Sequence, residues 1–110
     1  MKIISKQRLR KGYNDLVLQT TYDVLVDVFG EKTFSQMLQV MKESYALEWE
    51  DIPEKSQVFS SALRKMLGRG ATIIEDLIIE KLCLTLGKQL RWEKGLSFSD
   101  YLDKLTASYG

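Results

Sequence analysis

The chain has 110 residues, of which 45% are hydrophobic, and this is the usual size of one globular domain with a single core. Its 16 lysines and arginines nearly balance 15 aspartates and glutamates, so the net charge of +1 excludes a global attraction to nucleic acid or an anionic membrane. The sequence contains no histidine and a single cysteine, Cys83, which excludes catalytic triads, cysteine–histidine pairs and internal disulfides.

The same features bear on where the protein works. Cys83 lies in an apolar stretch and has no partner for a disulfide within the chain, so we expect a reduced, cytoplasmic setting. The amino-terminal residues lack the continuous apolar segment and the cleavage site of a signal peptide. Charged residues interrupt the most apolar stretch, residues 73–86, so we expect no transmembrane segment and no membrane partner.

The first predicted element is an amphipathic helix over residues 13–29. Apolar residues recur there at intervals of three and four, and Gly30 ends the pattern. Several β-branched residues leave a strand over part of this stretch open, but the periodicity favours a helix. A second stripe on this helix is polar and could face solvent or meet a basic partner; it consists of Asp15, Gln19, Asp23 and Asp27.

Two further helices are predicted in the middle of the chain. Thr33 and Gln36 have the spacing of a capping box, which indicates a helix that runs to about Leu47. The only proline, Pro53, interrupts the chain after it, and Asp51 is a candidate cap for the next helix. That third helix is expected to direct its apolar side chains inward: Val58, Phe59, Ala62, Leu63, Met66 and Leu67.

The pair Gly68 and Gly70 could be a phosphate-binding loop or a joint between two helices. A phosphate-binding glycine loop needs a strand before it, and the Walker form needs a lysine followed by serine or threonine. The pattern before Gly68 is helical, no such lysine follows, and glycine closes the last turn of a helix at little steric cost. Thr72 and Glu75 have the spacing of another capping box, so the joint is favoured.

The stretch 72–86 has hardly any polar arc, which predicts a central buried helix around which the others pack. A last helix is predicted around Phe98 and Leu105, with Ser97 or Ser99 as its cap, whereas residues 88–96 have only a weak pattern. The sequence therefore predicts an all-α, single-domain compact bundle of about five helices over residues 13–110, preceded by a basic amino-terminal arm, residues 1–12.

The amino-terminal arm favours an alternative function, nonspecific nucleic-acid binding. Lysines and arginines there are not accompanied by any carboxylate before Asp15, so the arm is a local basic segment on a nearly neutral chain. A helix-turn-helix is not supported, because the helix after the glycine pair offers almost no polar side chains to base edges. The candidate phosphate contacts are Lys2, Lys6, Arg8, Arg10, Lys11, Arg64, Lys65 and Arg69.

No catalytic, cofactor-binding or metal-binding residue is predicted. Asp76 and Glu80 lie four residues apart and could share a metal ion, but two carboxylates without further ligands make a weak site. The aromatic side chains are sufficient for an interface, although such residues at helical spacing more often belong to the core. They are Tyr45, Trp49, Trp92, Tyr101 and Tyr109.

The segment DIPEKSQVFSSALRKMLGRGATIIEDLIIEKL, residues 51–82, followed by SFSDYLDKL, resembles a small archaeal helical family described as the Nitrosopumilus output domain. The shared marks are Asp51–Pro53, Ala62–Leu63, Leu67–Gly68, Gly70–Ala71, Ile74–Glu75, Leu77–Ile78, Phe98 and Tyr101–Leu102. The resemblance implies a signalling output role and supplies no catalytic or ligand residues. We therefore expect a noncatalytic protein-interaction or signalling module of an archaeal cell that binds a protein partner or itself, as a homodimer.

Overall fold

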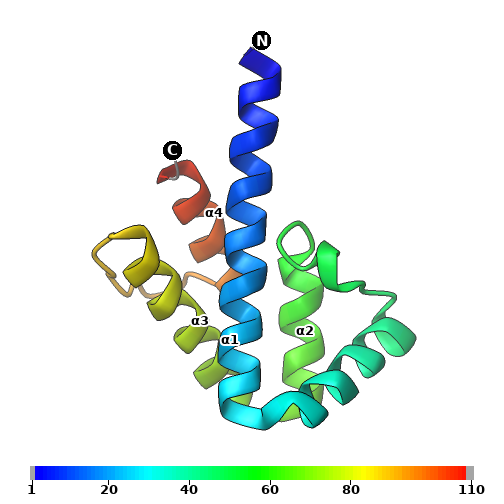
Figure 1. Ribbon diagram of the computed structural model, residues 1–110. Coiled ribbons are helices and arrows are strands. Elements are labelled where there is room, and N and C mark those ends of the chain that lie inside the picture. The colour runs from blue at the N-terminus through cyan, green and yellow to red at the C-terminus, as the bar shows by residue number, and fades with distance from the viewer. Residues whose placement is uncertain (1, 109–110) are drawn as a thin grey trace.

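The computed structural model describes the backbone of residues 2–108 and the side chains of residues 10–107. Over these residues the chain is all-helical, with no strand, which confirms the predicted fold class (Figure 1). The radius of gyration of 14.0 Å is that of a compact chain. The elements in chain order are α1 (Lys2–Tyr45), the short 3-10 helix η1 (Trp49–Asp51), α2 (Ser56–Leu67), α3 (Gly70–Leu86) and α4 (Phe98–Ser108).

Helix α1 is broken at Gly30. Its φ of 85° and ψ of 164° lie outside the helical region, and glycine adopts a positive φ without the steric penalty that a Cβ brings. The break is the helix end that the sequence predicts. Four α-helices are assigned between residues 2 and 108, instead of about five, because α1 counts as one element across Gly30. Its helical backbone also starts at Lys2, so it includes residues of the predicted basic arm.

Helix α3 packs against α1, α2 and α4, but it is not buried on all sides, and this part of the prediction for residues 72–86 is wrong. One side of α3 is in the core; it carries Ala71, Ile74, Ile78, Ile79 and Leu82. On the other side Ile73 and Leu84 are 64% and 82% exposed, and Leu77 is exposed as well. A helix with apolar residues all round needs neighbours all round, and three helices do not surround it.

The caps of the helices match the sequence only in part. Ser97 caps α4 as predicted: its hydroxyl accepts the N–H of Asp100 at 3.1 Å, and the Asp100 carboxylate accepts the N–H of Ser97 at 2.9 Å. Asp51 instead accepts the N–H of Glu48 at the start of η1, and α2 begins without a side-chain cap. Helix α3 begins at Gly70 without the Thr72–Glu75 capping box, because Glu75 bonds to α2.

The glycine pair joins two helices. Gly68 ends α2 with a positive φ of 58°, and its N–H donates to the carbonyl of Arg64 at 2.9 Å. Helix α3 starts at Gly70, so Gly68 and Arg69 are all that separates α2 from α3. A strand before the pair, which a phosphate-binding loop requires, is not present.

Aromatic side chains tie distant segments to the core. Phe34, just after the break in α1, makes edge-to-face contacts with Tyr22 and Trp49, with ring centroids 5.2 and 5.4 Å apart. Trp92, in contrast, is 49% exposed, and Val58 on α2 also faces solvent, so both depart from the predicted inward position. Tyr109 lies outside the described residues.

No helix among the described residues combines the length and the apolar character that crossing a bilayer requires.

Tyr13 joins the first and last helices. Its buried hydroxyl donates a hydrogen bond to the carbonyl of Leu102 at 2.6 Å, and burial raises the pKa of Tyr13. Tyr13→Phe should lower the free energy of unfolding by about 1 kcal/mol, because the carbonyl of Leu102 loses this donor. Urea denaturation followed by circular dichroism measures this. Tyr45→Phe is the control, since Tyr45 is half-buried and has no recorded hydrogen bond; equal stabilities for the two variants would contradict the assignment.

Candidate functional site

Two of the exposed apolar residues of α3, Leu77 and Leu84, form an open groove with α1. Its apolar floor comes from both helices, and charged side chains stand around the rim. The volume is about 360 Å³. We call this surface the α1–α3 groove; the floor is Val24, Val28, Leu77 and Leu84, and the rim is Asp23, Asp27, Glu80 and Lys81.

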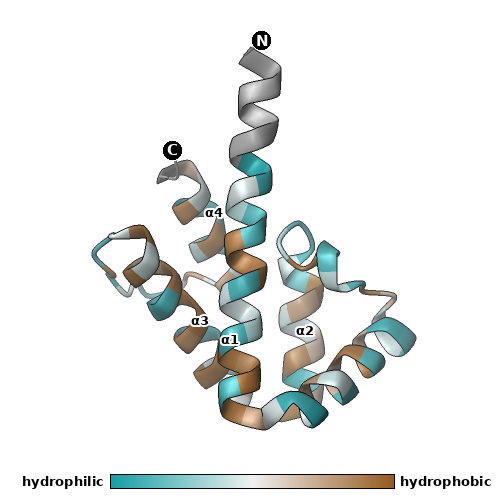
Figure 2. Cartoon of the chain, viewed as in Figure 1, coloured by the Kyte–Doolittle hydropathy of each residue, from teal (hydrophilic) through white to brown (hydrophobic). Residues whose placement is uncertain are grey.

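Helical spacing explains why these side chains meet. Leu77 and Leu84 are seven residues apart on α3, and Val24 and Val28 are four apart on α1, so each pair lies on one side of its helix. Most of α3 is coloured as hydrophobic in Figure 2, which agrees with the lack of a polar side. Single exposed apolar residues are common on protein surfaces, whereas a group of them rimmed by polar residues is typical of surfaces that bind a partner. Leu84 and Val28, at 82% and 48% exposure, belong to such a group.

The rim of the groove is negatively charged. It carries three carboxylates against one ammonium, and that ammonium, on Lys81, lies 3.7 Å from the carboxylate of Asp23. Asp27 and Glu80 have no ion pair or hydrogen-bond partner among the residues that the structure describes. The predicted acidic stripe of the first helix is therefore divided: Asp23 and Asp27 belong to the groove, and Asp15 does not.

Five of the eight candidate phosphate contacts have described side chains, and these five do not form one surface. Lys2, Lys6 and Arg8 lie outside the residues whose side chains are described. Arg10 donates two hydrogen bonds of 2.9 Å to the carboxylate of Glu54. Arg64 donates to Glu75 at 3.2 Å. The others, Lys11, Lys65 and Arg69, are exposed.

The candidate phosphate contacts with described side chains lie near opposite ends of α2. The contact with Glu54 places Arg10 beside the start of α2, whereas Arg64 and Lys65 are in its last turn. A helix of 12 residues is about 18 Å long, which separates the two groups by roughly that distance. Figure 1 shows the same arrangement, with the amino-terminal part of α1 at one end of the molecule and the joint between α2 and α3 at the other.

The sequence did not indicate the role of Glu75. This carboxylate is only 4% exposed, and it accepts hydrogen bonds from the hydroxyl of Ser60 and the guanidinium of Arg64, both on α2. Asp76 and Glu80 on the same helix are exposed. Between residues 10 and 107, no group of three or more histidine, cysteine, aspartate or glutamate side chains could hold a metal ion. Glu75 therefore serves to fix α2 against α3.

No family model, curated protein or solved structure matches the chain. The resemblance to the Nitrosopumilus output domain stays a prediction.

The Arg10–Glu54 pair gives the fold an acid-sensitive contact. Hydrogen bonds from Arg10, and then from Asn14, lower the pKa of Glu54 from its ordinary value of 4.5 to about 2. A lowered pKa in the folded state means that the ionised carboxylate stabilises the fold above about pH 4.5, and that this contribution is lost as the pH falls towards 2. Because half of the Glu54 side chain is exposed, we expect the ionised carboxylate to contribute less than about 1 kcal/mol to the free energy of unfolding.

Glu54→Gln should therefore flatten the pH dependence of stability between pH 2 and about 4.5, because the amide does not titrate. Urea denaturation at a series of pH values measures it, and the wild type should lose more stability on acidification than the variant. Glu50→Gln is the matched control, because Glu50 is exposed and has no recorded partner. Parallel pH profiles for the wild type and Glu54→Gln would contradict the prediction.

Proposed function

We propose that this protein is a noncatalytic interaction module that binds a basic, amphipathic helix of a partner protein in the α1–α3 groove. The observation that carries the proposal is the combination, in one groove, of an apolar floor that is exposed at Val28, Leu77 and Leu84 with two rim carboxylates that lack partners among the described residues. Apolar contacts would supply most of the affinity, and the carboxylates would select for cations.

A helix suits the shape of this surface. The floor residues Leu77 and Leu84 are seven positions apart, about 10.5 Å along the axis of α3. Two turns of a partner helix cover the same length, so apolar residues at positions i, i+3 or i+4, and i+7 of the partner would follow the floor. Lysines or arginines beside them would reach Asp27 and Glu80 on the rim.

Two features support a function without catalysis. The chain has no histidine to act as an acid or a base at neutral pH. Its one thiol, on Cys83, is buried, and burial raises the pKa of Cys83, which disfavours the nucleophilic thiolate. The resemblance noted in the sequence supports a more specific role for the same binding event, the output of a signal in the cytoplasm of an archaeal cell.

Nonspecific nucleic-acid binding is the alternative, and we rank it second. Phosphate binding requires cations that converge on one surface. The described cations of that set are divided between the two ends of α2, and Arg10 and Arg64 already bond to carboxylates.

Selection from a displayed library of helical peptides tests the proposal. Peptides that the wild type enriches should combine apolar residues at helical spacing with lysines or arginines. Leu84→Glu should weaken their binding by about tenfold or more, because it places a charge on the apolar floor. Since Leu84 is 82% exposed, we expect the fold to remain stable within about 0.5 kcal/mol, which circular dichroism would check.

Val58→Glu is the matched control, because Val58 is an exposed apolar residue on α2 that does not line the groove. It should leave peptide binding unchanged. Asp27→Lys should weaken the binding of basic peptides specifically. Enriched peptides that bind Leu84→Glu as well as the wild type, or that carry no excess of basic residues, would overturn the proposal.

Light scattering at micromolar concentration separates this partner from a homodimer. If the groove binds a helix of another protein, this chain should be a monomer in the absence of peptide. A dimer that Leu84→Glu converts to a monomer would mean that a second copy of the chain occupies the groove.

A further inference from the structure

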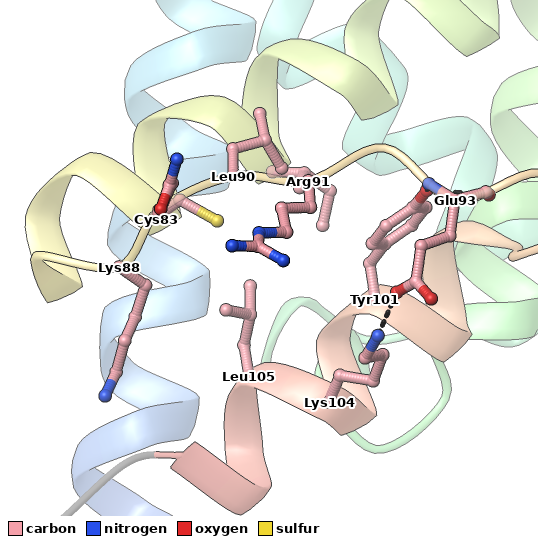
Figure 3. A pocket seen from close by; sticks show the side chains of 10 residues that line it. Cys83, Lys88, Leu90, Arg91, Glu93, Tyr101, Lys104 and Leu105 are labelled. Atoms are coloured by element: carbon pink, nitrogen blue, oxygen red, sulfur yellow. Dashed lines mark hydrogen bonds and ion pairs between the residues drawn. The ribbon is translucent and has the colours of Figure 1, made fainter.

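A second cavity lies on another side of α3, between its carboxyl-terminal half, the segment 87–97 and α4 (Figure 3). It has a volume of about 250 Å³ and is separate from the α1–α3 groove. Its apolar wall comes from all three segments: Ile79 and Cys83 from α3, Leu90 from the connecting segment and Leu105 from α4. We call it the α3–α4 cavity.

The connecting segment is anchored on both sides of the cavity. At its start, the N–H of Lys88 donates to the carbonyl of Cys83 at 2.9 Å. Further along, the hydroxyl of Tyr101 accepts the N–H of Glu93 at 2.8 Å and donates to the carbonyl of the same residue at 3.0 Å. The ring of Trp92 packs edge-on against Tyr101, 5.4 Å between centroids. Arg91 therefore lies on a short stretch of backbone that is held by hydrogen bonds on both sides.

The charge around the cavity is positive. Lysine or arginine side chains at three positions line it, against one carboxylate, Glu93, which forms an ion pair with Lys104. The side chains of Arg91 and Lys88 have no hydrogen bond or ion pair with the residues that the structure describes. In Figure 3 the guanidinium of Arg91 lies among the side chains of Cys83, Tyr101 and Leu105, whereas the ammonium of Lys88 points away from them.

From this geometry we infer that the α3–α4 cavity binds a small organic anion with an apolar tail, whose charged group pairs with Arg91. A planar guanidinium binds carboxylate or phosphate oxygens through two parallel hydrogen bonds. The tail of the ligand would lie against Ile79, Leu90 and Leu105.

The volume sets the size of the ligand. A cavity of about 250 Å³ accommodates about eight groups of the size of a water molecule, at about 30 Å³ each. It falls just below the range of about 300 to 1,000 Å³ that is typical of pockets for drug-sized ligands. A medium-chain carboxylate such as octanoate fits these limits.

The test is a titration of the full chain with octanoate, octyl phosphate and octanol, followed by two-dimensional NMR of backbone amides. Octanoate should bind saturably and shift the amides of the segment 88–93 and of Leu105, and octanol, which lacks the charge, should bind more weakly. Arg91→Gln should weaken the binding of octanoate about tenfold without affecting the binding of octanol, because it removes the charged hydrogen-bond donor. Leu105→Ala should weaken all three compounds, because the tail loses an apolar contact.

Arg69→Gln is the control, since Arg69 is an exposed arginine at the joint between α2 and α3, and it should leave every affinity unchanged. Tighter, Arg91-dependent binding of octyl phosphate would support the same site and identify the anionic group as a phosphate. The inference is overturned if neither anion binds saturably up to about 10 mM, or if Arg91→Gln binds octanoate as well as the wild type. These results do not depend on the α1–α3 groove.

Discussion

Helix α3 has more apolar surface than the described residues, 10–107, cover, and this constraint determines the two surfaces beside it. Its buried side, with Ile78 and Leu82, is the centre of the core that α1, α2 and α4 enclose. Glu75 on α3 is buried, and a buried carboxylate needs hydrogen-bond donors. Ser60 and Arg64 on α2 provide them, so these bonds hold α3 in place against α2. The uncovered side, with Leu77 and Leu84, becomes the floor of the α1–α3 groove.

The break at Gly30 contributes to the same result. Residues 31–45 pack back towards η1, where Phe34 meets Trp49, and they bring Met37 and Met41 into the core. They do not cover Val28, which stays 48% exposed beside α3. The positive φ of Gly30 thus lets residues 31–45 complete one side of the core. The side of α1 that carries Val28 stays uncovered and becomes part of the groove.

The sequence predicted the features that depend on local chemistry. The helical fold, the break at Gly30, the end of α2 at Gly68 and the cap at Ser97 each follow from a few neighbouring residues. The groove could not be predicted, because periodicity does not show which side of a wholly apolar helix lacks a neighbour. Glu75 was assigned to a capping box for a related reason: its bonds to α2 join residues that are 11 and 15 positions apart.

The near-neutral net charge is the sum of local surface charges that differ in sign. Adjacent residues on a helix point about 100° apart, so Cys83 and Leu84 face different sides of α3. Leu84 lies in a groove rimmed mainly by carboxylates, and Cys83 lies in a cavity that Arg91 also lines. A charge of +1 excludes a long-range attraction by the whole chain, but it does not constrain these two local fields, which screening confines to about 8 Å at physiological salt. The difference between these two surfaces is therefore a property of how α3 is packed.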